Sequence, residues 1–76
     1  MTREEEFKQL VEVNSREGME FCVSECETGT YISLEKEGDV VSTIVPLDIS
    51  KLGRAEIDNL ADVLCTYLLF KLEKRR

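Results

Sequence analysis

The segment Met19–Pro46, MEFCVSECETGTYISLEKEGDVVSTIVP, decides the fold, because apolar and polar residues alternate along it between glycine-containing turns. Alternation with a period of two is typical of β-strands that have one buried face. Over 19–25, the side chains of Met19, Phe21 and Val23 fall on one face and polar side chains fall on the other. We therefore predict a first strand over 19–25 with these three residues inward.

A second strand is predicted over 31–35, after a turn centred on Thr28 and Gly29. Ile32 and Leu34 share its inward face, while the residues between them are polar or carry a hydroxyl. The two strands form a hairpin whose apolar faces lie on the same side.

A third strand is predicted over 39–45, after a tight turn at Glu37-Gly38, where glycine can supply a positive φ. The strand is rich in β-branched residues and ends at Pro46, which cannot donate to a β-ladder. Its inward face stays open, because two alternating sets of side chains compete for it. These sets are Val41, Thr43 and Val45 on one side, and Val40, Ser42 and Ile44 on the other.

A helix over 3–16 is predicted before the strands. Thr2 and Glu5 have the spacing of a capping box, and apolar residues then recur at helical intervals from Phe7. Gly18 suits the position after a helix C-terminus. The segment 46–53 is a connector whose Leu47, Ile49 and Leu52 are expected to tuck under the edge of the sheet.

A second helix is predicted over 54–74, and one broad apolar face suits a three-stranded sheet. The residues of that face are Ile57, Leu60, Ala61, Leu64, Cys65, Leu68 and Leu72. The fold class is therefore α+β, with the order α-β-β-β-α, a three-stranded antiparallel meander and both helices packed on one face. The chain of 76 residues is predicted to form a single small domain over 1–76.

The second helix also carries a second apolar stripe, made by Val63, Tyr67 and Phe70. Two explanations stand: the first helix covers this stripe, or another chain does. Because the first helix is short and its apolar stripe is narrow, a partner helix, including that of a homodimer, is a real alternative. The basic end of the chain, which runs from Lys71 to Arg76, complements the helix dipole and could also reach the acidic sheet of a neighbour.

Charge is segregated along the chain, whose overall net charge is −6. Between Glu17 and Asp48 there are eight acidic residues and one basic residue, a net charge of −7. The candidate acidic partner-binding residues are Glu20, Glu25, Glu27, Glu35, Glu37 and Asp39. They either form a solvated surface or a docking face for a basic protein surface. Direct binding of nucleic acid or of an anionic membrane is disfavoured, because the negative charge repels phosphate.

Groups that catalyse reactions or bind metals are sparse. The chain has no histidine and none of the glycine-rich or serine nucleophile motifs. Its cysteines, Cys22, Cys26 and Cys65, are expected to pack as small apolar residues, with a metal or redox role as the alternative. We expect no catalytic residue, no cofactor and no metal.

The compartment expected is the cytoplasm. Three cysteines cannot all pair, no apolar signal-peptide region follows Met1, and no run of residues is long enough to span a membrane.

These observations favour a non-catalytic acidic protein-interaction module that engages a basic surface of a larger protein, such as a nucleic-acid-binding site. In size, acidic charge and order of elements the chain resembles small phage-encoded inhibitors of host nucleases and defence systems, such as anti-CRISPR proteins and nucleic-acid mimics. The resemblance implies an inhibitor or adaptor and assigns no residue a role. The alternative is a structural or accessory subunit that docks through the apolar C-terminal helix, and an enzyme is the least favoured class.

Overall fold

A computed structural model describes residues 2–27 and 29–75, and it confirms the predicted order of elements and the α+β fold class. The predicted turn residue Thr28, Met1 and the last residue of the basic end, Arg76, lie outside the described residues. The elements are α1 (Arg3–Glu12), β1 (Met19–Cys26), β2 (Gly29–Lys36), β3 (Asp39–Val45), a 3-10 turn η1 (Ile49–Lys51) and α2 (Arg54–Arg75).

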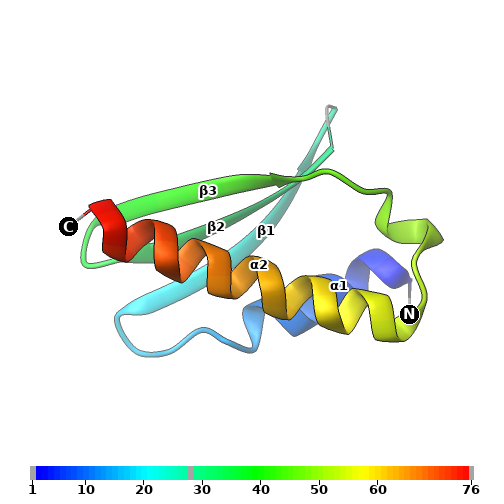
Figure 1. Ribbon diagram of the computed structural model, residues 1–76, viewed down its shortest axis with the longest axis horizontal. Helices are drawn as coiled ribbons and strands as arrows, with labels where there is room; N and C mark the ends of the chain where they lie inside the picture. The colour runs from blue at the N-terminus through cyan, green and yellow to red at the C-terminus, as the bar shows by residue number, and fades with distance from the viewer. Residues whose placement is uncertain (1, 28, 76) are drawn as a thin grey trace.

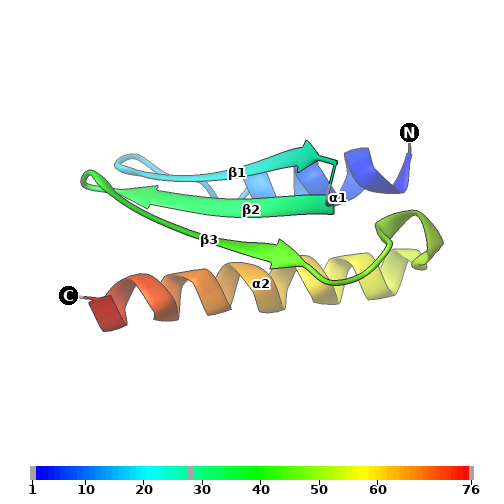
Figure 2. The same cartoon turned by 90° about the horizontal axis from the view of Figure 1, so that it is seen from above.

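The three strands form an antiparallel sheet in the order β1-β2-β3. Figure 1 shows α2 running the length of this sheet, and Figure 2 shows α1 behind β1 and β2 with α2 beside β3. Both helices therefore cover one face of the sheet and leave the other face open. Neither helix in the described part of the chain is long and apolar enough to cross a membrane.

The turn between β2 and β3 settles the inward face of β3. Lys36 pairs with Asp39 across the two-residue turn, so Leu34 lies opposite Val41. Partners across an antiparallel ladder project to the same side of the sheet, and Leu34 is fully buried. Val41 and Val45 are therefore inward, while Val40 and Ile44 project from the open face.

The core lies between the sheet and the two helices. Its β-strand members are the predicted inward residues of β1 and β2 together with Val41 and Val45. The buried residues are Phe7, Val11, Phe21, Ile32, Leu34, Val41, Val45, Ile49, Ile57, Ala61, Cys65, Leu68 and Leu72. Phe7 and Val11 from α1 have no exposed surface, which shows that the short helix is anchored by a few large side chains.

Helix α1 ends at Glu12, four residues earlier than the sequence predicts. The side chain of Asn14 donates to the carbonyl oxygens of Leu10 at 3.0 Å and Val11 at 3.4 Å, which satisfies groups that another helical turn would have used. Val13 is 75% exposed, so it does not widen the buried stripe of α1. At its start the helix is capped as predicted, with the Thr2 hydroxyl accepting from the Glu5 backbone N–H at 3.1 Å.

The connector after β3 agrees with the prediction in part. Ile49 is buried in η1 and Leu52 packs against the core, but Leu47 is 52% exposed and does not lie under the sheet.

Side chains from the end of α2 reach the outer edge of β3. Lys71 Nζ donates to the Ser42 carbonyl oxygen at 3.0 Å, and the Arg75 guanidinium donates to the Val40 carbonyl oxygen at 2.8 Å. These bonds tie the C-terminal end of the chain to the edge strand. They give the basic end a local structural role in addition to its favourable position at the helix C-terminus.

Candidate protein-interaction surfaces

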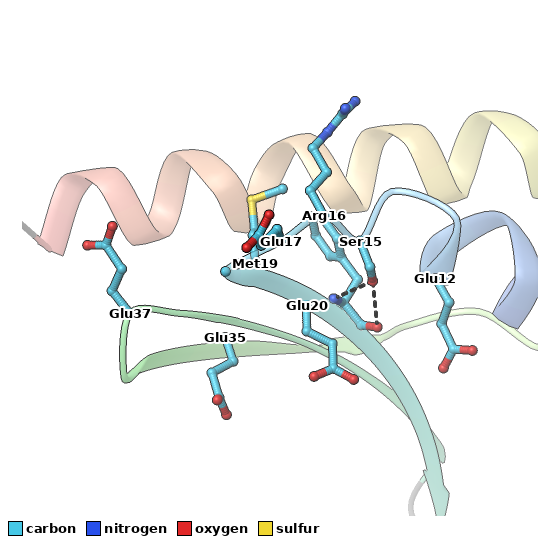
Figure 3. Close-up of a pocket in the computed structure, with 10 residues that line it drawn as sticks. Glu12, Ser15, Arg16, Glu17, Met19, Glu20, Glu35 and Glu37 are labelled. Atoms are coloured by element: carbon cyan, nitrogen blue, oxygen red, sulfur yellow. Dashed lines mark hydrogen bonds between the residues drawn. The ribbon is translucent and has the colours of Figure 1, made fainter.

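An acidic hollow lies where α1, the α1–β1 connection and the near ends of β1 and β2 meet. Its volume is about 710 Å³. We use the name acidic hollow for the surface that carries the carboxylates of Glu12, Glu17, Glu20, Glu35 and Glu37. Arg16 also lines it, and Figure 3 shows the Arg16 guanidinium on the same side as Glu17 and Glu37, pointing away from the carboxylates of Glu12, Glu20 and Glu35. The hollow is therefore strongly negative.

The connection between α1 and β1 is held rigidly enough to position these carboxylates. Arg16 and Met19 exchange two backbone hydrogen bonds of 2.7 and 2.9 Å, and the Ser15 hydroxyl accepts from the Phe21 N–H at 2.9 Å. Both contacts fasten the connection along the outer edge of β1. Glu17 lies within this closed loop, and Glu12 lies just before it at the end of α1.

Glu20 and Glu35 are direct partners across the β1–β2 ladder. Like charges placed opposite each other on a sheet destabilise it by a fraction of a kcal/mol. Glu12, Glu20 and Glu35 point to the same side in Figure 3, and all three raise the pKa of the neighbouring Cys22 thiol. Burial is the first cause of that raised pKa, followed by the charge of Glu20, whose carboxylate accepts the thiol hydrogen bond at 3.7 Å.

Glu37 occupies the first position of the two-residue turn between β2 and β3, and its φ is +52°. Left-handed backbone of this kind favours glycine, asparagine or aspartate over a residue with a longer side chain. Glutamate at this position therefore carries a local conformational cost. Two members of the acidic hollow, Glu35 and Glu37, thus sit where their residue type is unfavourable for stability.

The structure separates the predicted acidic residues into groups. Glu20, Glu35 and Glu37 gather at the hollow, together with Glu17. Asp39 lies next to the same turn, where it pairs with Lys36 in the ladder, and it does not line the hollow. Glu25 and Glu27 lie at the other end of β1. The six candidates therefore do not form one continuous face.

The open face of the sheet carries Cys22, Ser24, Tyr31 and Ser33, as the sequence predicts. The settled parity of β3 adds Val40 and Ile44, which are 49% and 45% exposed. Tyr31 lies opposite Ile44 in the ladder, so the face has an apolar cross-strand pair. It is less polar than the sequence alone indicated.

The second stripe of α2 is exposed: Val63 is 63%, Tyr67 46% and Phe70 61% accessible. Helix α1 does not cover it, because α1 packs against the opposite flank of α2, where Leu10 and Asn14 meet Ala61 and Cys65. Two lysines of α2 itself approach the two rings. Lys71 Nζ lies 5.9 Å from the centre of the Tyr67 ring, and Lys74 Nζ lies 5.8 Å from that of Phe70.

The cysteines divide into two exposed thiols and one buried thiol. Cys65 is buried as predicted, and burial raises its pKa above the ordinary value. Cys22 and Cys26 are exposed, so the expectation that the cysteines pack as small apolar residues is confirmed for Cys65 and wrong for these two, although the strand alternation did place Cys22 on the outward face. Their side chains share the open face of β1. Within residues 2–27 and 29–75, no three acidic or cysteine side chains are arranged to hold a metal ion.

Sequence reasoning missed Glu12 as a member of the acidic hollow. No local pattern marks it, because its place depends on where α1 ends and on how α1 docks beside β1. It left open whether Val40 and Ile44 lie on the open face, because alternation alone does not choose between the two faces of β3.

No family model, no curated protein and no solved structure matches the chain.

Proposed function

We propose that the chain is a non-catalytic acidic protein-interaction module that binds a basic surface, such as a nucleic-acid-binding site, of a larger protein. In this role it would act as an inhibitor or adaptor, as small phage-encoded anti-defence proteins do. The acidic hollow supplies the contact.

One observation carries the proposal: the hollow keeps carboxylates where they lower stability. Glu20 faces Glu35 across the ladder, and Glu37 occupies left-handed backbone. Neutral or turn-favouring residues would suit both places better, and departures of this kind from local preference are expected at functional sites. The carboxylates of Glu12, Glu20 and Glu35 come from α1, β1 and β2 and point to the same side (Figure 3), so a cationic surface could contact all three at once.

A defined cationic probe tests the proposal directly. A fluorescent hepta-arginine peptide is titrated against the full chain, and ¹⁵N chemical-shift changes locate the contact. We expect the changes to centre on Glu12, Glu20 and Glu35, and the affinity to fall steeply between low and high salt. The triple variant Glu12→Gln/Glu20→Gln/Glu35→Gln should bind about tenfold more weakly, since three partly exposed charge pairs contribute on the order of 0.5 kcal/mol each.

The matched control removes the same number of charges elsewhere, with Glu5→Gln, Glu25→Gln and Glu27→Gln in one chain. This variant has the same net charge as the test variant but an intact hollow. Equal weakening by both variants would mean that only net charge matters and would contradict a localised site. Affinity that does not change with salt would contradict the acidic contact itself.

A second candidate function is favoured by the exposure of Val63, Tyr67 and Phe70. A structural or accessory subunit that docks through α2 would bury this stripe and leave the hollow in solvent. Alanine at Tyr67 and Phe70 should then abolish assembly, while the three glutamine substitutions in the hollow should leave it intact. The first proposal predicts the reverse pattern.

We also propose that the protein works in the reducing environment of the cytoplasm. An exposed thiol at Cys22 supports this location, because such thiols persist in reducing compartments. Mass spectrometry of alkylated protein from intact cells should find Cys22 reduced. A stable disulfide at Cys22 would contradict the location.

A further inference from the structure

The exposed stripe of α2 continues in both directions beyond Val63, Tyr67 and Phe70. Leu60 extends it toward the start of the helix, and a charged residue closes each end. The complete stripe, named here the α2 seam, consists of Glu56, Leu60, Val63, Tyr67, Phe70 and Lys74. Successive members are separated by four, three, four, three and four residues. That alternation is the spacing of the two contact positions in a coiled-coil heptad.

The seam is available for contact along its length. Glu56 and Lys74 are exposed, and one carboxylate oxygen of Glu56 accepts from the Gly53 backbone N–H at 3.0 Å. The three central apolar residues keep about half or more of their accessible surface, with values of 46 to 63%. Leu60 is partly buried and packs against the core with one side. The seam therefore lies on a different part of α2 from the sheet-facing residues that hold the helix in place.

The order of residues along the seam is symmetric about Cys65. Glu56 and Lys74 are equally far from residue 65, as are Leu60 and Phe70, and as are Val63 and Tyr67. If two copies of α2 cross antiparallel at this residue, each seam residue meets a different residue of the other copy. Val63 then packs on Tyr67, Leu60 packs on Phe70, and Glu56 faces Lys74.

We propose that α2 pairs antiparallel with the α2 of a second copy of this chain, in the register that places residue 65 at the two-fold axis. Charge decides the orientation. A parallel pair would set Glu56 against Glu56 and Lys74 against Lys74, whereas the antiparallel pair joins opposite charges at both ends and aligns the helix dipoles favourably. The pairing also separates the basic ends of the two helices by about 27 Å, for a rise of roughly 1.5 Å per residue.

The seam is short for a coiled coil, but α2 does not need a partner in order to form. Isolated helices of this length are marginal because the chain must first be ordered. Here five residues of α2, including Ile57 and Leu68, are buried in the core and already hold the helix. Pairing therefore has to order only the seam side chains. The acidic hollow contains no α2 residue, so its carboxylates are not concentrated at the seam.

The first test is the mass of the full chain in solution, measured by light scattering over a range of concentrations. We expect the wild-type chain to form a dimer. Its dissociation constant should rise about tenfold when Glu56→Lys or Lys74→Glu is introduced alone, because the two end pairs of the dimer become repulsive. The double variant Glu56→Lys/Lys74→Glu should restore the dimer, since the charges are exchanged. Lys8→Glu makes the same charge change as Lys74→Glu, but on α1, and it should have no effect on the dimer.

The apolar part of the seam has its own matched pair of variants. Phe70→Ser should give a monomer, while Ile44→Ser removes a similarly exposed apolar side chain from the open face of the sheet and should leave the dimer intact. Circular dichroism checks that each variant is folded. A monomer at every concentration, or equal effects of the two serine substitutions, would overturn the proposal and assign the seam to a different protein.

Cross-linking tests the register. Glu56→Cys and Lys74→Cys are made separately, each with serine at Cys22 and Cys26, and then oxidised alone and mixed. The antiparallel pair predicts a disulfide-linked dimer only in the mixture, because each position lies about 27 Å from its own copy. Self-linking of either variant alone would overturn the antiparallel register.

Discussion

The pKa of the Cys22 thiol is sensitive to the carboxylates of the acidic hollow. It lies on the open face of β1 within reach of Glu20, and the charges of Glu12 and Glu35 act on it as well. Partial burial and, after it, the charges of these carboxylates disfavour the thiolate, so the pKa of Cys22 lies above the ordinary cysteine value. The surroundings of this exposed cysteine therefore lower its reactivity.

This raised pKa predicts how Cys22 alkylation depends on pH. In a Cys26→Ser background, iodoacetamide should modify the folded chain more slowly than the urea-unfolded chain at pH 8, because the thiolate is the reacting species. The difference between the two alkylation rates should disappear as the pH rises through the pKa of Cys22 in the folded chain. Glu20→Gln should speed alkylation of the folded chain, since it removes the nearest charge.

The buried Cys65 provides an internal reference, because it should react only after unfolding. Glu25→Gln, at the other end of β1, serves as the matched control and should leave the rate for Cys22 unchanged. Equal rates in the Glu20→Gln and wild-type chains would show that the charge of Glu20 does not act on the thiol.

At the scale of elements, the turn between β2 and β3 links stability to the proposed function. Its two residues, Glu37 and Gly38, both have positive φ, which is the backbone that a two-residue hairpin requires. Asn-Gly is the sequence that such turns favour. Glu37 departs from that preference and lines the acidic hollow.

The variant Glu37→Asn should therefore be more stable than wild type. A gain of about 0.5 kcal/mol is expected from relief of the left-handed glutamate, and for a domain of this size that raises Tm by about 2 to 4 °C. The same variant should bind the hepta-arginine probe more weakly, because one carboxylate is lost. Thermal unfolding and the peptide titration measure the two effects.

Glu27→Asn, a control at the opposite end of the sheet, removes the same charge. It should change neither the probe affinity nor Tm to a comparable extent. A Glu37→Asn chain that is no more stable than wild type would contradict the conformational cost assigned to Glu37.

Much of the fold could be predicted because the local signals agree. Alternation in β1 and β2, the capping residues of α1 and the broad apolar face of α2 each indicate one structure. The parity of β3 was predictable too, from the two-residue turn that pairs Lys36 with Asp39. The end of α1 was not: the Asn14 side chain bonds back to the Leu10 carbonyl oxygen, but its contact with Cys65 and the bond of the Ser15 hydroxyl to Phe21 depend on residues farther along the chain.

The sites were less predictable than the fold, and for a physical reason. Helical periodicity found Val63, Tyr67 and Phe70, but only packing shows that α1 occupies the other flank of α2. Charge density found Glu20, Glu35 and Glu37, yet it could not include Glu12, whose place depends on how α1 docks. Which residues share a surface depends on how elements dock, and a single sequence does not state that directly.

On the scale of the whole molecule, the two candidate surfaces belong to different elements. The acidic hollow is built by α1, β1 and the turn after β2, while the α2 seam lies on the last helix. A dimer formed through the seam would therefore present two hollows at once. A partner with repeated basic sites would then be held by both, with an avidity that neither hollow has alone.

The hydrogen bonds from Lys71 and Arg75 to β3 have a further consequence, which concerns misassembly. An edge strand with open carbonyl groups is a template on which strands of other molecules can add, and lysine or arginine at the edge opposes this addition.

The double variant Lys71→Ala/Arg75→Ala should therefore form thioflavin-positive fibres sooner than wild type. The control variant Lys8→Ala/Lys51→Ala, with the same loss of charge, should not. If both double variants behave alike, net charge and not the covered edge keeps the protein dispersed. Earlier fibre growth in the Lys71→Ala/Arg75→Ala variant alone would mean that the last turn of α2 protects the edge of β3 from strand addition, so that shortening the chain would threaten its solubility before its fold.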